Sequence, residues 1–98
     1  MSSGIPKEFQ LLAHTIKVRV IPRSKWRHGK NVVGMWMPDK LRIDLIADPI
    51  ETQLQATFCH ELCHALLDMM NHELSHDEVF VDNLGALLMQ ALVTFKTE

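Results

Sequence analysis

The chain contains no tyrosine and only two cysteines, four glycines and four prolines among its 98 residues. There is no Cys-x-x-Cys pair, which excludes the common cysteine-based zinc and redox motifs. Cys59 and Cys63 lie four residues apart in an expected helix, where the geometry for a disulfide is poor. We therefore interpret both as small buried hydrophobic residues in a reducing compartment.

No hydrophobic run approaches the length of a membrane span. The first six residues also lack the basic, apolar and small-residue progression of a secretory signal, so we expect a cytoplasmic protein. A net charge of −2 at pH 7 indicates no general affinity for nucleic acid or for anionic membranes. A hydrophobic content of 47% in 98 residues predicts one small globular domain that spans residues 1–98.

Against this plain background, residues 60–64 follow the pattern H-E-x-x-H. In a helix, His60 and His64 lie one above the other on the same face, so their ring nitrogens can meet one tetrahedral zinc ion. Glu61 is rotated by about 100° from His60, which lets its carboxylate reach a water molecule on the metal without binding the metal. The sequence therefore predicts His60 and His64 as zinc ligands and Glu61 as a general base.

The flanking residues support a helix over about residues 49–71. Asp48 is the expected N-cap, with Pro49 at the first helical position and Glu51 closing a capping box. No lysine or arginine occurs between Glu51 and Met70, which indicates a partly buried site more than a solvated face. A polar stripe follows one side of this helix: Thr57, His60, Glu61, His64 and Asp68.

Asp68 lies one turn after His64, where a carboxylate can hold the imidazole of a metal ligand. The alternative interpretation of the whole stripe is a helix with two ordinary surface histidines.

The remainder of the chain predicts an α+β fold. Alternating apolar and polar residues indicate strands, and apolar residues at helical spacing indicate a second helix. A basic stretch around Trp26 is more typical of a solvated hairpin loop than of a surface for nucleic acid or an acidic partner. We expect an antiparallel sheet of about three strands, packed on one side against two C-terminal helices. The expected elements are a short helix over 6–14, strands over 14–21, 32–37 and 41–46, and helices over 49–71 and 75–95.

A catalytic zinc usually takes three protein ligands, so a third residue has to join the two histidines. Glu78 and Asp82 are spaced i and i+4 on the second helix, and Glu78 is our preferred ligand. His76, in the turn before that helix, is the second candidate. A competing structural role exists for Glu78, because Ser75-x-x-Glu78 is itself a capping box.

Two segments resemble the minimal zincin-type metallopeptidase domains, most closely the ImmA/IrrE-like group of phages, prophages and bacteria. They are His60-Glu61-Leu62-Cys63-His64-Ala65-Leu66-Leu67 and the looser stretch that runs from Asp77 to Met89. The resemblance covers about residues 40–92. It implies two helices on a small sheet, zinc bound by His60, His64 and Glu78, and Glu61 as base. The segment from His76 to Phe80 is also similar to SprT-like and WLM-type metallopeptidases, which would make His76 the ligand.

The expected reaction is hydrolysis of a peptide or protein substrate, in which Glu61 takes the proton of a water molecule and passes it to the leaving nitrogen. The Leu41–Ile46 strand is the expected edge for an extended substrate. Because tyrosine is absent, His72, His28 or a backbone N–H would have to stabilise the oxyanion. The alternative function is an inactive, zinc-stabilised interaction module of phage or prophage origin.

Overall fold

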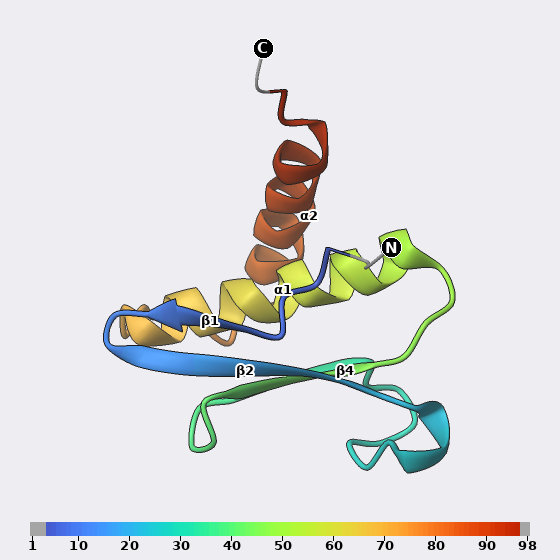
Figure 1. Ribbon diagram of the computed structural model, residues 1–98. Helices are drawn as coiled ribbons and strands as arrows, with labels where there is room; N and C mark the ends of the chain where they lie inside the picture. The colour runs from blue at the N-terminus through green and yellow to red at the C-terminus, as the bar shows by residue number, and fades with distance from the viewer. Residues whose placement is uncertain (1–3, 97–98) are drawn as a thin grey trace.

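The computed structural model describes residues 4–96 as a four-stranded sheet with two helices, which confirms the expected α+β class. Helix α1 lies across one face of the sheet, and helix α2 stands up from α1 on the side away from the sheet (Figure 1). None of the helices within this described part is long and apolar enough to cross a membrane. The elements are β1 (Glu8–Leu11), β2 (His14–Ile21), a short 3-10 turn (Arg23–Lys25), β3 (Gly34–Met37), β4 (Arg42–Ile46), α1 (Glu51–Met69) and α2 (Glu78–Thr94).

The short helix predicted over residues 6–14 is wrong, since this segment forms strand β1. It pairs antiparallel with β2 from Glu8 opposite Lys17 to Leu11 opposite His14. Phe9 points toward α1, where its ring meets the ring of Phe58 edge-on with centroids 6.1 Å apart. Burial of this aromatic pair and pairing with β2 outweigh a helical spacing that spans only three apolar positions.

The strand order is β1-β2-β4-β3, and β4 runs parallel to β2, so the sheet is mixed and not purely antiparallel as expected. Strand β4 lies between two strands and is covered on both faces: Ile43 and Leu45 have no exposed surface, and Asp44, which points to the opposite face, is 1% exposed. The Leu41–Ile46 segment is therefore not a cleft edge. Strand β3 has no strand on its outer side and provides the free edge near the helices.

The basic stretch after β2 is a crossover to β3 rather than a hairpin loop, and it covers the outer face of β4. Its His28 Nε2 lies 2.9 Å from Asp44 Oδ2, and Arg42 Nε donates to Asp44 Oδ1 at 2.9 Å. These two partners satisfy a carboxylate that would be costly to bury alone. At least one residue of the basic stretch thus has a structural role.

Helix α1 is the middle layer of the molecule and carries apolar residues toward both neighbours. Toward the sheet, Leu54 joins Ile16, Val18, Ile43 and Leu45 in one buried cluster. Toward α2, Cys63 and Leu67 pack with Val81, while Leu84 and Leu88 contact this second cluster. The remaining sides of α1 are therefore left to the polar stripe.

Helix α1 begins two residues later than predicted. The Asp48 carboxylate does accept a hydrogen bond, but from the Ile50 N–H at 2.8 Å, and Ile50 itself is the N-cap residue. Pro49 therefore precedes the helix, and Glu51 is its first residue. The helix ends in a Schellman motif: Asn71 adopts a φ of 53°, and the His72 N–H donates to the Leu67 carbonyl at 2.9 Å.

Helix α2 begins at Glu78 and not at Ser75. The Asp77 carboxylate caps it by accepting a hydrogen bond from the Phe80 N–H at 2.9 Å. The predicted capping box between Ser75 and Glu78 does not form. The Glu78 side chain is consequently free for another partner.

The two helices cross closely at Gly85. A Cβ atom at this position would lie 3.2 Å from the Cα and 3.3 Å from the backbone nitrogen of His60, closer than ordinary van der Waals contact. The absence of a side chain lets α2 approach the backbone of α1 at the first histidine of the motif.

This contact gives a first prediction. Gly85→Val should lower the free energy of unfolding by about 1–3 kcal/mol, because the added methyl groups force the two helices apart. Ala86→Val is the matched control on the exposed neighbouring position, where only a helix-propensity cost of about 0.5 kcal/mol is expected. Urea unfolding measures both, and equal destabilisation by the two variants would contradict the close crossing.

Candidate functional site

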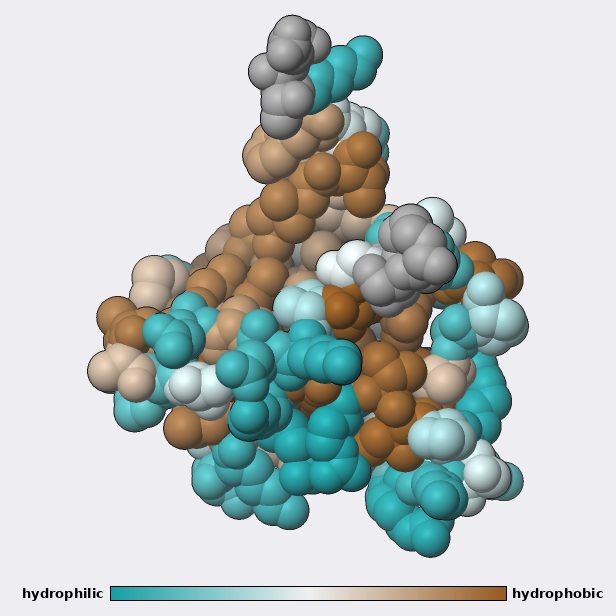
Figure 2. All heavy atoms as spheres, in the orientation of Figure 1, coloured by the Kyte–Doolittle hydropathy of each residue, from teal (hydrophilic) through white to brown (hydrophobic). Residues whose placement is uncertain are grey.

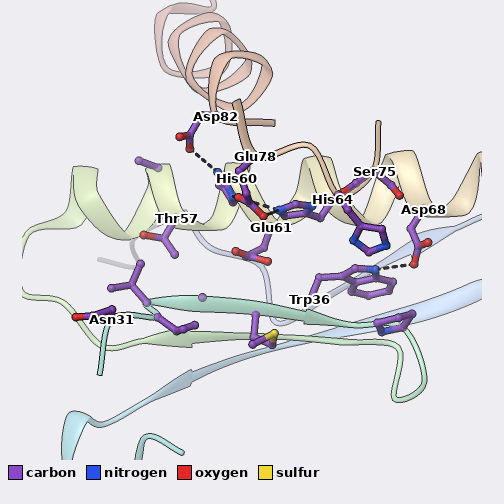
Figure 3. Close-up of a pocket in the computed structure, with 17 residues that line it drawn as sticks. Asn31, Trp36, Thr57, His60, Glu61, His64, Asp68, Ser75, Glu78 and Asp82 are labelled. Carbon is purple, nitrogen blue, oxygen red and sulfur yellow. Dashed lines mark hydrogen bonds and ion pairs between the residues drawn. The ribbon is translucent and has the colours of Figure 1, made fainter. Parts of the chain in front are cut away.

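An open cleft of about 700 Å³ lies between strand β3 and helix α1 and reaches the start of α2 (Figure 3). The whole predicted polar stripe of α1 faces this cleft, which confirms that its five residues share one side of the helix. The other polar or charged residues of its lining are Asn31, Ser75, His76, Glu78 and Asp82, together with the indole of Trp36.

Two imidazoles and one carboxylate converge at the α2 side of the cleft. The Nε2 atoms of His60 and His64 are 3.2 Å apart. Glu78 Oε1 lies 3.0 Å from the Nε2 of His60, and Glu78 Oε2 lies 3.3 Å from the Nε2 of His64. We call these three residues the donor cluster. Among the residues that the structure describes, the donor cluster is the one group of three His, Cys, Asp or Glu side chains that lie close enough together to share a metal ion.

The second nitrogen of each ring determines what the donor cluster can bind. His64 Nδ1 lies 2.6 Å from the carbonyl oxygen of Ser75, and His60 Nδ1 lies 2.9 Å from Asp82 Oδ1. Both partners only accept hydrogen bonds, so each Nδ1 carries a proton and donates it. In a neutral imidazole the Nε2 atom is then left with a lone pair.

With both rings neutral, two Nε2 lone pairs and a carboxylate face one another at short range. Two electron-rich atoms repel each other unless a cation or a proton lies between them. Zinc–nitrogen bonds of 2.0–2.1 Å in a tetrahedron place neighbouring ligand atoms about 3.3 Å apart. The Nε2–Nε2 separation of 3.2 Å matches that edge, and each Nε2 atom has one of the two Glu78 oxygens at 3.0 or 3.3 Å. The residues present thus fit a divalent cation such as zinc.

The fourth residue of interest, Glu61, is almost fully buried, with 8% of its surface exposed. Its carboxylate accepts a hydrogen bond from the backbone N–H of Trp36 on β3, and its Cγ lies where a side chain on Gly34 would clash. Burial raises the pKa of this carboxyl group above its usual value, and the nearby His64 and His60 oppose that rise. A carboxylate with a raised pKa, beside a possible metal site, is suited to moving protons.

Other predicted residues lie elsewhere. His76 lines the cleft but is outside the donor cluster. The Asp68 carboxylate accepts a hydrogen bond from the Trp36 indole N–H at 3.0 Å, whereas His64 is held by a backbone carbonyl, so Asp68 does not hold the imidazole as predicted. His28 is bound to Asp44 on the outer face of the sheet, and the His72 ring stacks on Phe80 outside the cleft lining.

The sequence reasoning missed two positioning contacts. Asp82 was considered only as a possible ligand, yet in the structure it fixes the ring of His60. The Ser75 carbonyl fixes the ring of His64, and no side-chain pattern reveals a backbone acceptor. The i and i+4 spacing of Glu78 and Asp82 was the available signal, since it places both carboxylates above the same histidine.

Comparison of the chain with models of protein families, with curated proteins and with solved structures gave no significant match. The assignment of a function therefore depends on the geometry of the cleft.

The neighbouring cysteines allow a second prediction. Cys63 has no exposed surface, and burial raises the pKa of its thiol to about 11. Near pH 8, about one molecule in a thousand would then carry the reactive thiolate. Alkylation by iodoacetamide, followed by mass spectrometry, should be about 100-fold slower at Cys63 in the folded protein than in denaturant. Similar rates in the two conditions would contradict burial of this thiol between the helices.

Proposed function

We propose that the protein is a zinc-dependent metallopeptidase. The observation that carries the proposal is the convergence of the Nε2 atoms of His60 and His64 and the Glu78 carboxylate beside the buried carboxylate of Glu61. His60, His64 and Glu78 would hold the zinc ion. This ligand set agrees with the resemblance to minimal zincin-type domains, which rests on the same residues.

Bound zinc would lower the pKa of a water molecule and polarise the scissile carbonyl group. Glu61 removes a proton from the attacking water and delivers it to the leaving nitrogen as the C–N bond breaks. The hydrogen bond from the Trp36 N–H restrains the Glu61 carboxylate in the cleft.

An extended peptide substrate would lie along the free edge of β3. The Ile46 N–H donates to the Val33 carbonyl, so the alternation of an antiparallel ladder directs the backbone groups of Gly34 and Trp36 away from β4. Because the Trp36 N–H already donates to Glu61, the outward groups left for a peptide are those of Gly34 and the Trp36 carbonyl. A peptide pairing with this edge would pass the donor cluster on the opposite wall of the cleft. This placement replaces the β4 edge expected from the sequence.

The group that stabilises the oxyanion is best sought at His76. It is the remaining histidine of the cleft lining, and the chain has no tyrosine for the task. An imidazolium or imidazole N–H at the mouth of the cleft would donate to the developing negative charge. If no such donor reaches the substrate, the same metal site would serve the alternative function, a zinc-stabilised interaction module without activity.

The general-base role is tested by Glu61→Gln, which keeps the shape of the side chain and removes its ability to accept a proton. We expect zinc content to stay at the wild-type level and peptide hydrolysis to fall by about 10²- to 10⁴-fold. Elemental analysis and a quenched-fluorescence peptide library measure the two quantities. Asp68→Asn is the matched control, because it changes another cleft carboxylate that lies outside the donor cluster. Full activity in Glu61→Gln would defeat the assignment, and absence of hydrolysis in the wild-type zinc protein would favour the inactive module.

The third ligand is tested by Glu78→Ala and His76→Ala. Only the first should weaken zinc binding, by more than the roughly 10–100-fold loss that follows removal of an outer hydrogen-bond partner. Asp82→Asn should fall within that smaller range, because Asp82 only orients His60. Competition titrations with a chromogenic chelator measure the affinities. Loss of zinc in His76→Ala together with retention in Glu78→Ala would reverse the assignment.

A further inference from the structure

The C-terminal half of helix α2 is left largely exposed by the other residues that the structure describes. No charged residue occurs between Asp82 and Lys96, and Leu87 is 70% exposed. Figure 2 shows this half as a hydrophobic column that stands clear of the body. A helix that is apolar on most of its sides is normally buried against something else.

An apolar groove opens beside the base of this helix, between the C-terminal end of α1 and the turn that joins β1 to β2. It has a volume of about 370 Å³ and is lined by Leu11, Leu12, Leu66, Leu67, Met69, Met70 and Leu84. Leu12 is 80% exposed and holds a φ of 56°, a backbone region that favours glycine or asparagine. The chain thus presents a leucine at a turn position where a small or polar residue would be easier to place.

The groove and the uncovered helix belong to one continuous surface. At 100° per residue, Leu87, Ala91 and Phe95 lie within about 60° of Leu84, which is part of the groove wall. We call the line Leu84, Leu87, Ala91 and Phe95 the ridge. Glu78 and Asp82 lie on another side of α2, toward the cleft, so the ridge is separate from the donor cluster.

We propose that a second copy of this chain covers the surface, with the ridge of each protomer seated in the groove of the other. A two-fold dimer requires one patch that is complementary to itself. A convex apolar ridge beside a concave apolar groove meets this requirement, and the lack of charge along residues 83–95 removes like-charge repulsion when two copies of α2 approach.

The exposed apolar area approaches what such a dimer needs. Five side chains on this surface remain at least one-third exposed, and burying a large apolar side chain removes roughly 100 Å² from water. Together they offer about 500 Å² per copy before any flanking polar surface is counted, against about 800 Å² per partner in a typical stable interface. The five are Leu12, Met70, Phe80, Leu87 and Phe95.

The test is the mass of the chain in solution, measured by sedimentation equilibrium at about 1–100 µM protein. The wild type should have twice the monomer mass of 11.3 kDa. Leu87→Asp on the ridge and Leu12→Asp in the groove should each raise the dissociation constant by at least about 100-fold. Val93→Asp is the matched control on α2, since Val93 is 57% exposed but lies about 180° from Leu84 on the helix.

Circular dichroism should show that the aspartate variants keep the helical content of the wild type, and the two variants lie in different elements, so both would have to unfold to hide the effect. A monomeric wild type over this concentration range overturns the proposal, including the case in which the monomer binds neutral lipid vesicles through the same surface. A dimer that Val93→Asp disrupts while Leu87→Asp and Leu12→Asp leave it intact also overturns it. None of these outcomes depends on zinc or on hydrolysis, so they test the dimer independently of the proposed function.

Discussion

The crossing of α1 and α2 at Gly85 is the contact on which the candidate site depends. Helix α1 supplies both histidines, but the carboxylate that completes the donor cluster comes from helix α2. Glu78 sits about two turns before Gly85, so the distance between the helix backbones at Gly85 sets how near its carboxylate comes to the imidazoles. The Val81 side chain, buried between these two levels against Cys63 and Leu67, fixes the rotation of α2 about its axis.

Contacts at the Nδ1 atoms of His60 and His64 then orient the two rings so that their Nε2 atoms can bind a metal ion. A pair of neutral histidines has several possible tautomers, and only one combination directs both Nε2 lone pairs inward. Asp82 and the Ser75 carbonyl select that combination because neither can donate. The turn over residues 71–77 carries the second acceptor, so the Schellman motif at Asn71 and the cap at Asp77 also serve the site by fixing the path of that turn.

The sequence predicts features that depend on residues close together in the chain. It does not predict features that depend on residues brought together only by the fold. The H-E-x-x-H spacing lies within one helix, so the shared face of His60, Glu61 and His64 followed from helical periodicity alone. The helix predicted over residues 6–14 rests on Phe9, Leu12 and Ala13, and only Phe9 of these lies in strand β1. The alternation in β2 and β4 showed which face of each strand is buried but carried no information on which strands pair, so the parallel pairing could not be foreseen.

The start of α2 shows why the third ligand was harder to assign than the first two. Ser75 and Asp77 are both good N-caps, and the choice between them decides whether Glu78 closes a capping box or projects into the cleft. The carboxylate at Asp77 accepts from the Phe80 N–H, so Asp77 is the N-cap, the helix begins at Glu78, and the Glu78 side chain has no capping role. A shift of two residues in a helix boundary, the usual uncertainty of such assignments, thus separates a structural role from a ligand.

Helix α2 consequently has two halves with different physical demands. Its first half is anchored by a cap, by Val81 and by Gly85, and it carries the acidic side chains of the site. Its second half, from Ala86 onward, has few intramolecular contacts and no charged pairs along its length. Short helices in water are marginal without tertiary packing, so an apolar half-helix of this length gains most of its stability from whatever surface covers it.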